Sequence, residues 1–273
     1  SINMINFLKK MSEYSRERAD LLPDRVPSEK LDLAVFKIKF SDFDIIAEFK
    51  HTSPAEGKLA RLSQECGAQA CEYAKGGAAA ISILTEPTRF NGKIEHLHEV
   101  ASNINEFSLP AMRKDFLVDT KQILESRKYG ASGLLLIANL LSPKMLRKML
   151  DCAFEHSMFV LLESFDEDDI QKSLTLLKES RYQKKAHEKH LLFGVNSRDL
   201  KTLKVNFNRF EEFATKMPSD IIKVAESGIN KSSEILSVKK NGYQMALIGS
   251  ALMKSAQPEL MISEYLMHGR GKK

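Results

Sequence analysis

Short apolar runs recur along the chain, and each is followed by a longer stretch whose apolar residues are spaced as on one face of a helix. Eight runs are predicted to be strands, at residues 45–50, 79–84, 109–114, 133–138, 158–163, 191–196, 221–226 and 245–249. The gaps between them leave room for a crossover helix each time, which is typical of a parallel sheet covered on both faces. The pattern predicts an α/β fold, a closed (β/α)8 or TIM barrel. The alternative is an open doubly wound sheet, but no GxGxxG motif follows the first run.

Two segments depart from this rhythm. Residues 1–44 precede the first predicted strand, and we interpret them as an N-terminal helical extension: a helix, a Pro-containing turn at 22–27 and a second helix. Residues 173–190 are longer and more charged than the corresponding segments elsewhere, which predicts an extended fifth helix followed by a loop. We expect residues 1–273 to form a single barrel domain.

The composition narrows the class of protein. The chain has 273 residues, 43% of them hydrophobic, but contains no run of about 18 apolar residues such as a membrane span requires. The net charge is +5, and the basic residues are spread along the chain except for two runs, at 178–190 and 268–273, which are not interleaved with aromatic residues. We therefore expect a small anionic substrate as partner, and neither nucleic acid nor membrane. Cys66, Cys71 and Cys152 form neither a CxxC motif nor a zinc-ligand spacing. We therefore expect a soluble cytoplasmic protein with reduced thiols, no metal and no cofactor.

The first predicted strand carries two charges on one face. Glu48 and Lys50 are two residues apart, and side chains alternate along a strand, so both point the same way. If that face is buried, the two charges add little to the stability of the fold, and a functional site is the better explanation. We expect Lys50 to pair with Glu48 and thereby to stay protonated. The alternative is two ordinary surface charges beside a half-buried strand.

Polar residues also occur where the other strands are predicted to end, and the active site of a TIM barrel lies at that rim. The lysines and glutamates among them (Lys50, Lys114, Glu48, Glu163 and Glu226) suit proton transfer without a metal. Ser227-Gly228 and Gly249-Ser250 follow the last two strands, where barrels often bind phosphate, and Ser53 adds a third hydroxyl. Each Gly-Ser pair taken alone is typical of a tight turn.

Taken together, these segments resemble the indole-3-glycerol phosphate synthase family. The similar motifs follow one another in order, at residues 48–54, 82–86 with 90–92, 113–116, 135–137, 194–200, 226–229 and 247–253, and the N-terminal extension is similar too. The resemblance implies ring closure of 1-(2-carboxyphenylamino)-1-deoxyribulose 5-phosphate to indole-3-glycerol phosphate in tryptophan biosynthesis, with loss of carbon dioxide and water. It implies a carboxy-lyase without a cofactor.

The resemblance also implies roles for individual residues. Lys114 would protonate the ketone oxygen, Glu163 would assist the later dehydration, and Lys50, beside Glu48, would contact the carboxylate or the departing hydroxyl. Which of Glu48, Lys50 and Glu163 moves the dehydration proton stays open. The remaining implied contacts are Asn196, Arg198 and Glu226 for the sugar hydroxyls and the charge network, Ser53, Ser227, Gly228, Gly249 and Ser250 for the phosphate, and Phe90, Phe116, Leu135 and Ile137 for the aromatic ring. Leu135 and Ile137 equally fit the barrel core.

The chain departs from the family in two loops. The family usually has Arg-Ala-Ser-Pro-Ser-Lys or similar where this chain has residues 51–56, ending in Ala55-Glu56, and Lys93 stands where a small residue is common. Both departures affect the expected loop dynamics and affinity more than the chemistry. The rival hypotheses are another phosphosugar barrel enzyme, an imine-forming aldolase and a catalytically silent binding homologue. Association with other tryptophan-pathway enzymes stays open.

Overall fold

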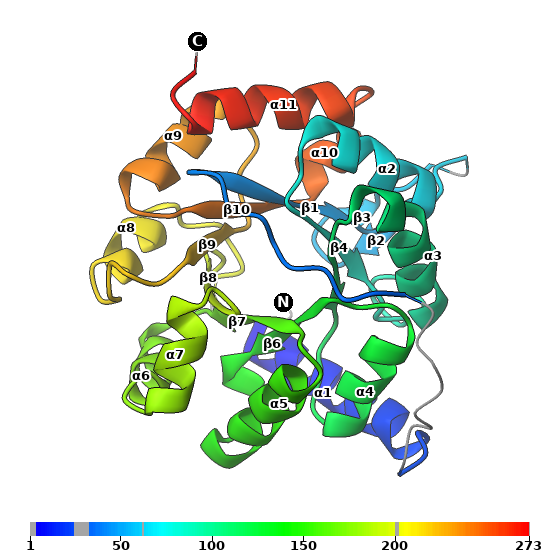
Figure 1. The fold of residues 1–273 in the computed structure, drawn as a ribbon, viewed down its shortest axis with the longest axis vertical. Coiled ribbons are helices and arrows are strands. Elements are labelled where there is room, and N and C mark those ends of the chain that lie inside the picture. The colour runs from blue at the N-terminus through cyan, green and yellow to red at the C-terminus, as the bar shows by residue number, and fades with distance from the viewer. Residues whose placement is uncertain (1–3, 25–32, 62, 200–201, 273) are drawn as a thin grey trace.

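The structure is a computed structural model that describes residues 4–24, 33–61, 63–199 and 202–272. Eight parallel strands close into a barrel in the order β1-β10-β9-β8-β7-β6-β5-β4, as Figure 1 shows. The strands are β1 Asp44–Phe49, β4 Ala80–Leu84, β5 Ala111–Lys114, β6 Gly133–Ile137, β7 Phe159–Ser164, β8 Leu191–Asn196, β9 Lys223–Glu226 and β10 Met245–Ile248. The TIM barrel predicted from the apolar runs is confirmed, and each strand bound lies within two residues of its predicted position.

Helices follow the strands and form the outer layer of the barrel (Figure 1). They are α2 Cys66–Gly76, α3 Ile94–Ile104, α4 Thr120–Lys128, α5 Pro143–Glu155, α6 Glu167–Leu176, α7 Ser180–His187, α8 Asn208–Ala214, α9 Ser232–Lys240, α10 Ser250–Lys254 and α11 Pro258–Gly269. Several begin at a side-chain cap: the Asp119 carboxylate accepts a hydrogen bond from the backbone of Lys121, and the Ser142 hydroxyl accepts one from Met145. Such caps satisfy backbone donors that a helix start leaves free.

The N-terminal extension is only partly as predicted. The first helix is present as α1, Met4–Asp20. The second predicted helix falls partly on residues 25–32, which lie outside the described residues, and it is wrong for residues 33–43, which contain no helix. Lys37 and Lys39 are exposed while Ile38 between them is buried, a period of two that fits extended chain better than a helix.

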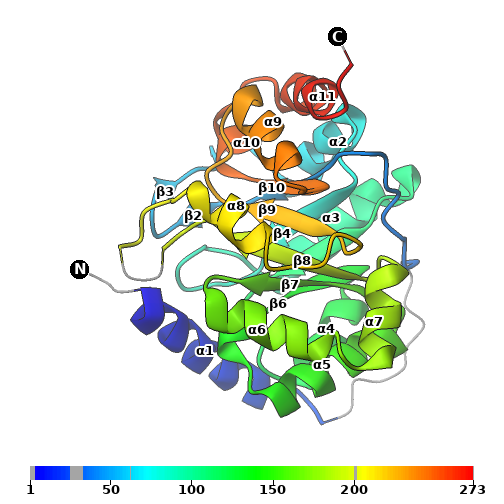
Figure 2. The ribbon, with the colours of Figure 1, turned by 90° about the vertical axis from the view of Figure 1, so that its left-hand side faces the viewer.

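The predicted extended fifth helix at 173–190 is also wrong. The chain forms the end of α6 and then a separate short helix, α7. Two buried residues, Tyr182 and Ala186, hold α7 against the core, and the Tyr182 hydroxyl donates a 2.8 Å hydrogen bond to Asp151. Figure 2 shows α7 at the end of the barrel opposite the short hairpin β2–β3 (Thr52–Ser53 and Gly57–Lys58).

The core has two parts. One lies between the strands and the outer helices, and the other fills the barrel with side chains such as Met112, Leu161 and Leu192. The inner part continues to Leu8 and Met11 of α1, which therefore cover one end of the barrel interior. Among the described residues, no helix has the length and apolar character needed to cross a membrane.

Candidate active site

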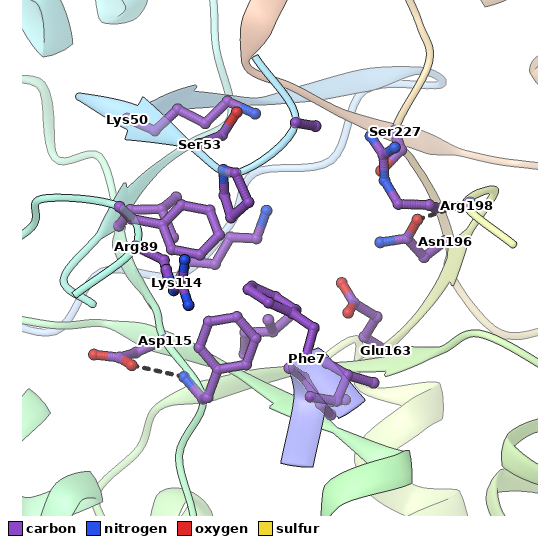
Figure 3. Close-up of a pocket in the computed structure, with 18 of the residues that line it drawn as sticks. Phe7, Lys50, Ser53, Arg89, Lys114, Asp115, Glu163, Asn196, Arg198 and Ser227 are labelled. Carbon is purple, nitrogen blue, oxygen red and sulfur yellow. Dashed lines mark hydrogen bonds between the residues drawn. The ribbon is translucent and has the colours of Figure 1, made fainter. Parts of the chain in front are cut away.

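A cavity of about 390 Å³ lies where the strands end, between the barrel and α1 (Figure 3). This volume is in the range of small-molecule sites. The structure brings together twelve of the predicted site residues along its wall: Lys50, Ser53, Phe90, Lys114, Phe116, Leu135, Ile137, Glu163, Asn196, Arg198, Ser227 and Ser250. They come from both early and late strands, so the barrel closure is what assembles them.

Four predicted residues do not line the cavity. Glu48 and Glu226 are buried beneath it, each about 1% exposed. Gly249 packs against Glu48, because a Cβ atom at Gly249 would lie 3.2 Å from the Glu48 Oε1 atom. Gly228 has a φ of +78° and faces Val205. The two glycines therefore permit close packing around the site. Glu48 and Glu226 influence the site through their charges, because both raise the pKa of Lys114.

Lys114 forms the central ion pair of the site. Its ammonium Nζ atom lies 3.0 Å from the Glu48 carboxylate, which also accepts a 2.7 Å hydrogen bond from Ser82. Burial alone would lower the pKa of Lys114, but the carboxylates of Glu48, Glu226 and Glu163 together outweigh it and raise that pKa above its usual value. Lys114 is therefore a charged proton donor held at the cavity.

Lys50 does not form the expected pair with Glu48. The Glu48 carboxylate is taken by Lys114 and Ser82, and no ion pair within 4.0 Å involves Lys50 among the described residues. Burial lowers the pKa of Lys50, and Glu48 opposes this only in part, so the charged form of Lys50 lacks the ion pair that was expected to support it. A shared strand face did not decide the partner, because the long Lys114 side chain reaches Glu48 from two strands away.

Glu226 and Glu163 form a second pair. Burial, followed by the neighbouring Glu163 carboxyl, raises the pKa of Glu226 well above its usual value. Neither carboxyl oxygen of Glu226 has a partner that meets hydrogen-bond geometry. Gly194 makes room for this group, since a Cβ atom there would lie 2.2 Å from Glu226 Oε2. Two buried carboxyls next to each other disfavour double ionisation, and the raised pKa favours the protonated form of Glu226.

The loop after β8 is ordered by its own polar atoms. The Arg198 backbone donates a 3.0 Å hydrogen bond to the Asn196 side chain, and the Arg198 guanidinium donates a 2.7 Å bond to the carbonyl of Leu203. Figure 3 shows Asn196, Arg198 and Ser227 together on one side of the cavity, with Glu163 next to Asn196 and Lys114 across from them. These polar groups suit hydroxyls of a bound sugar.

The β2–β3 hairpin lies over another part of the cavity. The Ser53 hydroxyl accepts a 3.2 Å hydrogen bond from the Glu56 backbone, which fixes the turn, and Glu56 itself lines the cavity. Ser250, the first residue of α10, lines the same region. Hydroxyls therefore gather at this end of the site.

The opposite part of the cavity is aromatic. The Phe116 ring lies 5.9 Å from the ring of Phe90 and 5.9 Å from that of Phe7. Phe7 and Leu8 belong to α1 and were not predicted as site residues, because sequence alone does not show where a preceding helix docks. Arg89 was also missed, although its position directly before Phe90 was a usable signal.

A set of charges centred on Asp115, at the edge of the cavity, fastens α1 to the loop after β5. Arg18 binds the buried Asp115 carboxylate through two hydrogen bonds of 2.7 and 2.8 Å, and Thr85 donates a third of 2.6 Å. Burial alone would raise the pKa of Asp115, but Arg18 and Arg113 lower it to about 2. This ion pair holds the wall that α1 contributes to the cavity.

The arrangement supports acid and base chemistry on a small anionic ligand. It combines a charged lysine, a pair of neighbouring carboxyls, an aromatic wall and a group of hydroxyls. The described residues contain no cluster of three or more histidine, cysteine or acidic side chains that would suit a metal ion.

Comparison with known proteins identifies the family. A family model described as indole-3-glycerol phosphate synthase matches residues 16–265. The indole-3-glycerol phosphate synthase of Aquifex aeolicus is 36% identical, covering 96% of this chain and 99% of that protein, and that of Mycobacterium leprae is 37% identical, covering 82% and 77%. The solved 3-hexulose-6-phosphate synthase from Salmonella typhimurium shares the barrel fold, with a TM-score of 0.62 at 12% identity over 83% of this chain and 100% of that chain. The chain therefore belongs to the indole-3-glycerol phosphate synthase family.

Proposed function

We propose that the protein is an indole-3-glycerol phosphate synthase, a carboxy-lyase of tryptophan biosynthesis. Its substrate is 1-(2-carboxyphenylamino)-1-deoxyribulose 5-phosphate, and its reaction is ring closure with loss of carbon dioxide and water. The observation that carries the proposal is the charged Lys114, set among three carboxyls at a cavity with one aromatic and one hydroxyl-rich region. The substrate has a ring at one end and a phosphate at the other, which matches this division.

Lys114 acts as the general acid of the first step. The aromatic carbon that bears the carboxylate attacks the ketone carbon, and the ketone oxygen takes a proton from the Lys114 ammonium. Carbon dioxide then leaves, and its bonding electrons restore the aromatic ring. The Glu48 carboxylate supports this role because it keeps the ammonium positioned at 3.0 Å and charged.

The dehydration step needs an acid for the departing hydroxyl and a base for the proton lost from the ring system. Glu163 lines the cavity next to Glu226, whose raised pKa favours its protonated form, so this pair of carboxyls is suited to both transfers. Lys50 lines the cavity without an ion-pair partner among the described side chains, which supports contact with the substrate carboxylate. Its lowered pKa also makes the Lys50 ammonium a stronger acid towards the departing hydroxyl.

The two ends of the substrate occupy different walls. Ser53, Ser227 and Ser250 contact the phosphate, with Gly228 and Gly249 allowing close approach. Phe90 and Phe116 hold the ring together with Leu135 and Ile137, and Asn196 and Arg198 contact the sugar hydroxyls. All but the two glycines line the cavity, which supports this orientation. The three free cysteines support a location in the cytoplasm, where thiols stay reduced.

Product formation provides a direct test. The protein contains no tryptophan, so the indole fluorescence of the product can be followed without background from the chain. We expect fluorescence to rise when the carboxyphenylamino substrate is added, together with release of one carbon dioxide per product. Binding of substrate without fluorescence or carbon dioxide would contradict the proposal and favour a catalytically silent homologue.

A further inference from the structure

Glu56 places a carboxylate at the hydroxyl-rich end of the cavity. It stands in the turn of the β2–β3 hairpin and lines the cavity together with Ser53 and Ser250. The Ser250 side chain hydrogen-bonds to it, and the Lys254 ammonium lies 3.6 Å from Glu56 Oε1. The Glu56 side chain is 33% exposed, so it is partly enclosed by these neighbours.

The neighbours of Glu56 favour its charged form. Burial would raise the pKa of Glu56, but the hydrogen bond from Ser250 and the positive charges of Lys50 and Lys254 lower it below the usual value. The carboxylate is therefore ionised at neutral pH. A negative charge that accepts a hydrogen bond from a hydroxyl, pairs with the Lys254 ammonium and is attracted by the Lys50 ammonium is in the surroundings that a phosphate ester would also need.

Glu56 and a phosphate group cannot use these donors at the same time. Both are anions, and two like charges a few ångströms apart in a partly enclosed site repel strongly. The turn that carries Glu56 can move without disturbing the core, because residues 54–58 are all exposed. Gly57 has a φ of +70° and no atom within 4 Å of the position of its missing Cβ, so the turn has space around it.

We propose that Glu56 is an internal anion that occupies the phosphate end of the empty site and is displaced when the substrate phosphate binds. Glu56 thereby sets the affinity for phosphate and couples its binding to movement of the hairpin. This inference rests on the proposed function, since it assumes that the phosphate binds between Ser53 and Ser250.

Calorimetric titration with inorganic phosphate tests the inference apart from turnover. We expect Glu56→Gln, which removes the charge and keeps the shape, to bind inorganic phosphate about five to ten times more tightly than the wild type. The KM for the substrate should fall in parallel, while kcat changes by less than about twofold because the acid and base groups are intact. Glu56→Asp retains the charge and should stay close to the wild type.

Glu188→Gln is the matched control. It makes the same change in net charge at Glu188, which lies between α7 and β8 and does not line the cavity. It should leave phosphate affinity unchanged. Equal phosphate affinity in Glu56→Gln and the wild type would overturn the inference, as would a fall in kcat without a change in affinity.

Two further outcomes separate this inference from the proposed function. If neither protein binds phosphate but both form indole product, the internal anion is wrong and the reaction stands. If Glu56→Gln binds phosphate more tightly but no protein forms product, the internal anion stands and the proposed reaction is wrong.

Discussion

The two faces of strand β5 carry opposite kinds of charge network. Lys114 points into the barrel, towards Glu48, Glu163 and Glu226. Arg113 and Asp115, one residue to either side, point outwards and meet Arg18 and other polar groups. Adjacent residues of one strand thus serve two networks, as the alternation of side chains requires.

The outer network pairs its charges with opposite charges, although the buried Nε atom of Arg18 has no hydrogen-bond partner. The Asp115 carboxylate accepts hydrogen bonds from Arg18, Thr85 and the Phe116 backbone, and Arg113 donates to Thr85 and Glu125. Each buried charge has an opposite charge with good geometry, so there is no reason for a proton to move. Such a network fixes structure.

The inner network is not satisfied. One ammonium faces three carboxyls, and the Glu226 oxygens have no hydrogen-bond partner of good geometry. Burial, followed by the negative charge of Glu163, raises the pKa of Glu226 and favours its protonated form. Comparison of the two faces teaches that the same residue types anchor the fold where charges balance and prepare chemistry where they do not.

Removal of Lys114 should have the largest effect on function. We expect Lys114→Met to lower kcat by about 100- to 10,000-fold, because a positioned general acid contributes that much, while binding of the substrate persists. The control is Lys121→Met, whose side chain has the same exposure of 22% but lies outside the cavity. Near-normal turnover of Lys114→Met would remove this lysine from the mechanism.

Loss of the Asp115 charge from the outer network should instead reduce the stability of the fold. We expect Asp115→Asn to lower the free energy of unfolding by about 3 kcal/mol, since it leaves the buried Arg113 and the partly buried Arg18 without their shared carboxylate. Urea denaturation measures this, with Asp119→Asn as control because its partner Arg16 is 42% exposed. A loss below about 1 kcal/mol in Asp115→Asn would contradict the anchoring role.

The acid dependence of stability gives the same network a second readout. The pKa of Asp115 is about 2 in the folded protein and higher when unfolded, so its stabilisation is present above the unfolded value and is lost as the pH falls towards 2. We expect Asp115→Asn to lose this part of the acid dependence.

The barrel and most of the residues that line the cavity could be predicted from the sequence, because both follow from residues that are close to one another in the chain. Each apolar run and the polar residues that end it lie together in the chain, and parallel strands bring those ends to one rim. The sequence did not show that Lys114, rather than Lys50, holds Glu48, or that Phe7 and Arg18 of α1 reach the loop after β5. These contacts depend on side-chain reach and helix docking, which local pattern does not encode. The role assigned to each site residue stays a prediction.

Replacement of the Glu226 carboxyl by a neutral group should change how the free energy of unfolding depends on pH. Between the unfolded and the raised folded pKa of Glu226, the folded protein binds more proton than the unfolded one, so the free energy of unfolding falls as the pH rises through this window. We expect Glu226→Gln to flatten that fall and to be about 1–3 kcal/mol more stable than the wild type above the folded pKa. Chemical denaturation across this pH range measures both values. If the free energy of unfolding depends on pH in the same way in Glu226→Gln and the wild type, the pKa of Glu226 is not raised in the folded protein.

The smallest expected effect separates the two cavity lysines. Lys50 has no ion-pair partner among the described side chains, so it is available to the substrate carboxylate, whereas Lys114 is held by Glu48 and faces the ketone oxygen. We expect Lys50→Met to weaken binding of a reduced analogue that carries the aryl carboxylate by about tenfold, or 1.4 kcal/mol, and to affect an analogue without it much less. Lys114→Met should weaken both analogues equally. Because burial lowers the pKa of Lys50, the preference for the carboxylate should also fade on the alkaline side at a lower pH than for an exposed lysine. Equal losses for the two analogues with Lys50→Met would show that Lys50 does not bind the carboxylate, and would favour its role as the acid that protonates the departing hydroxyl.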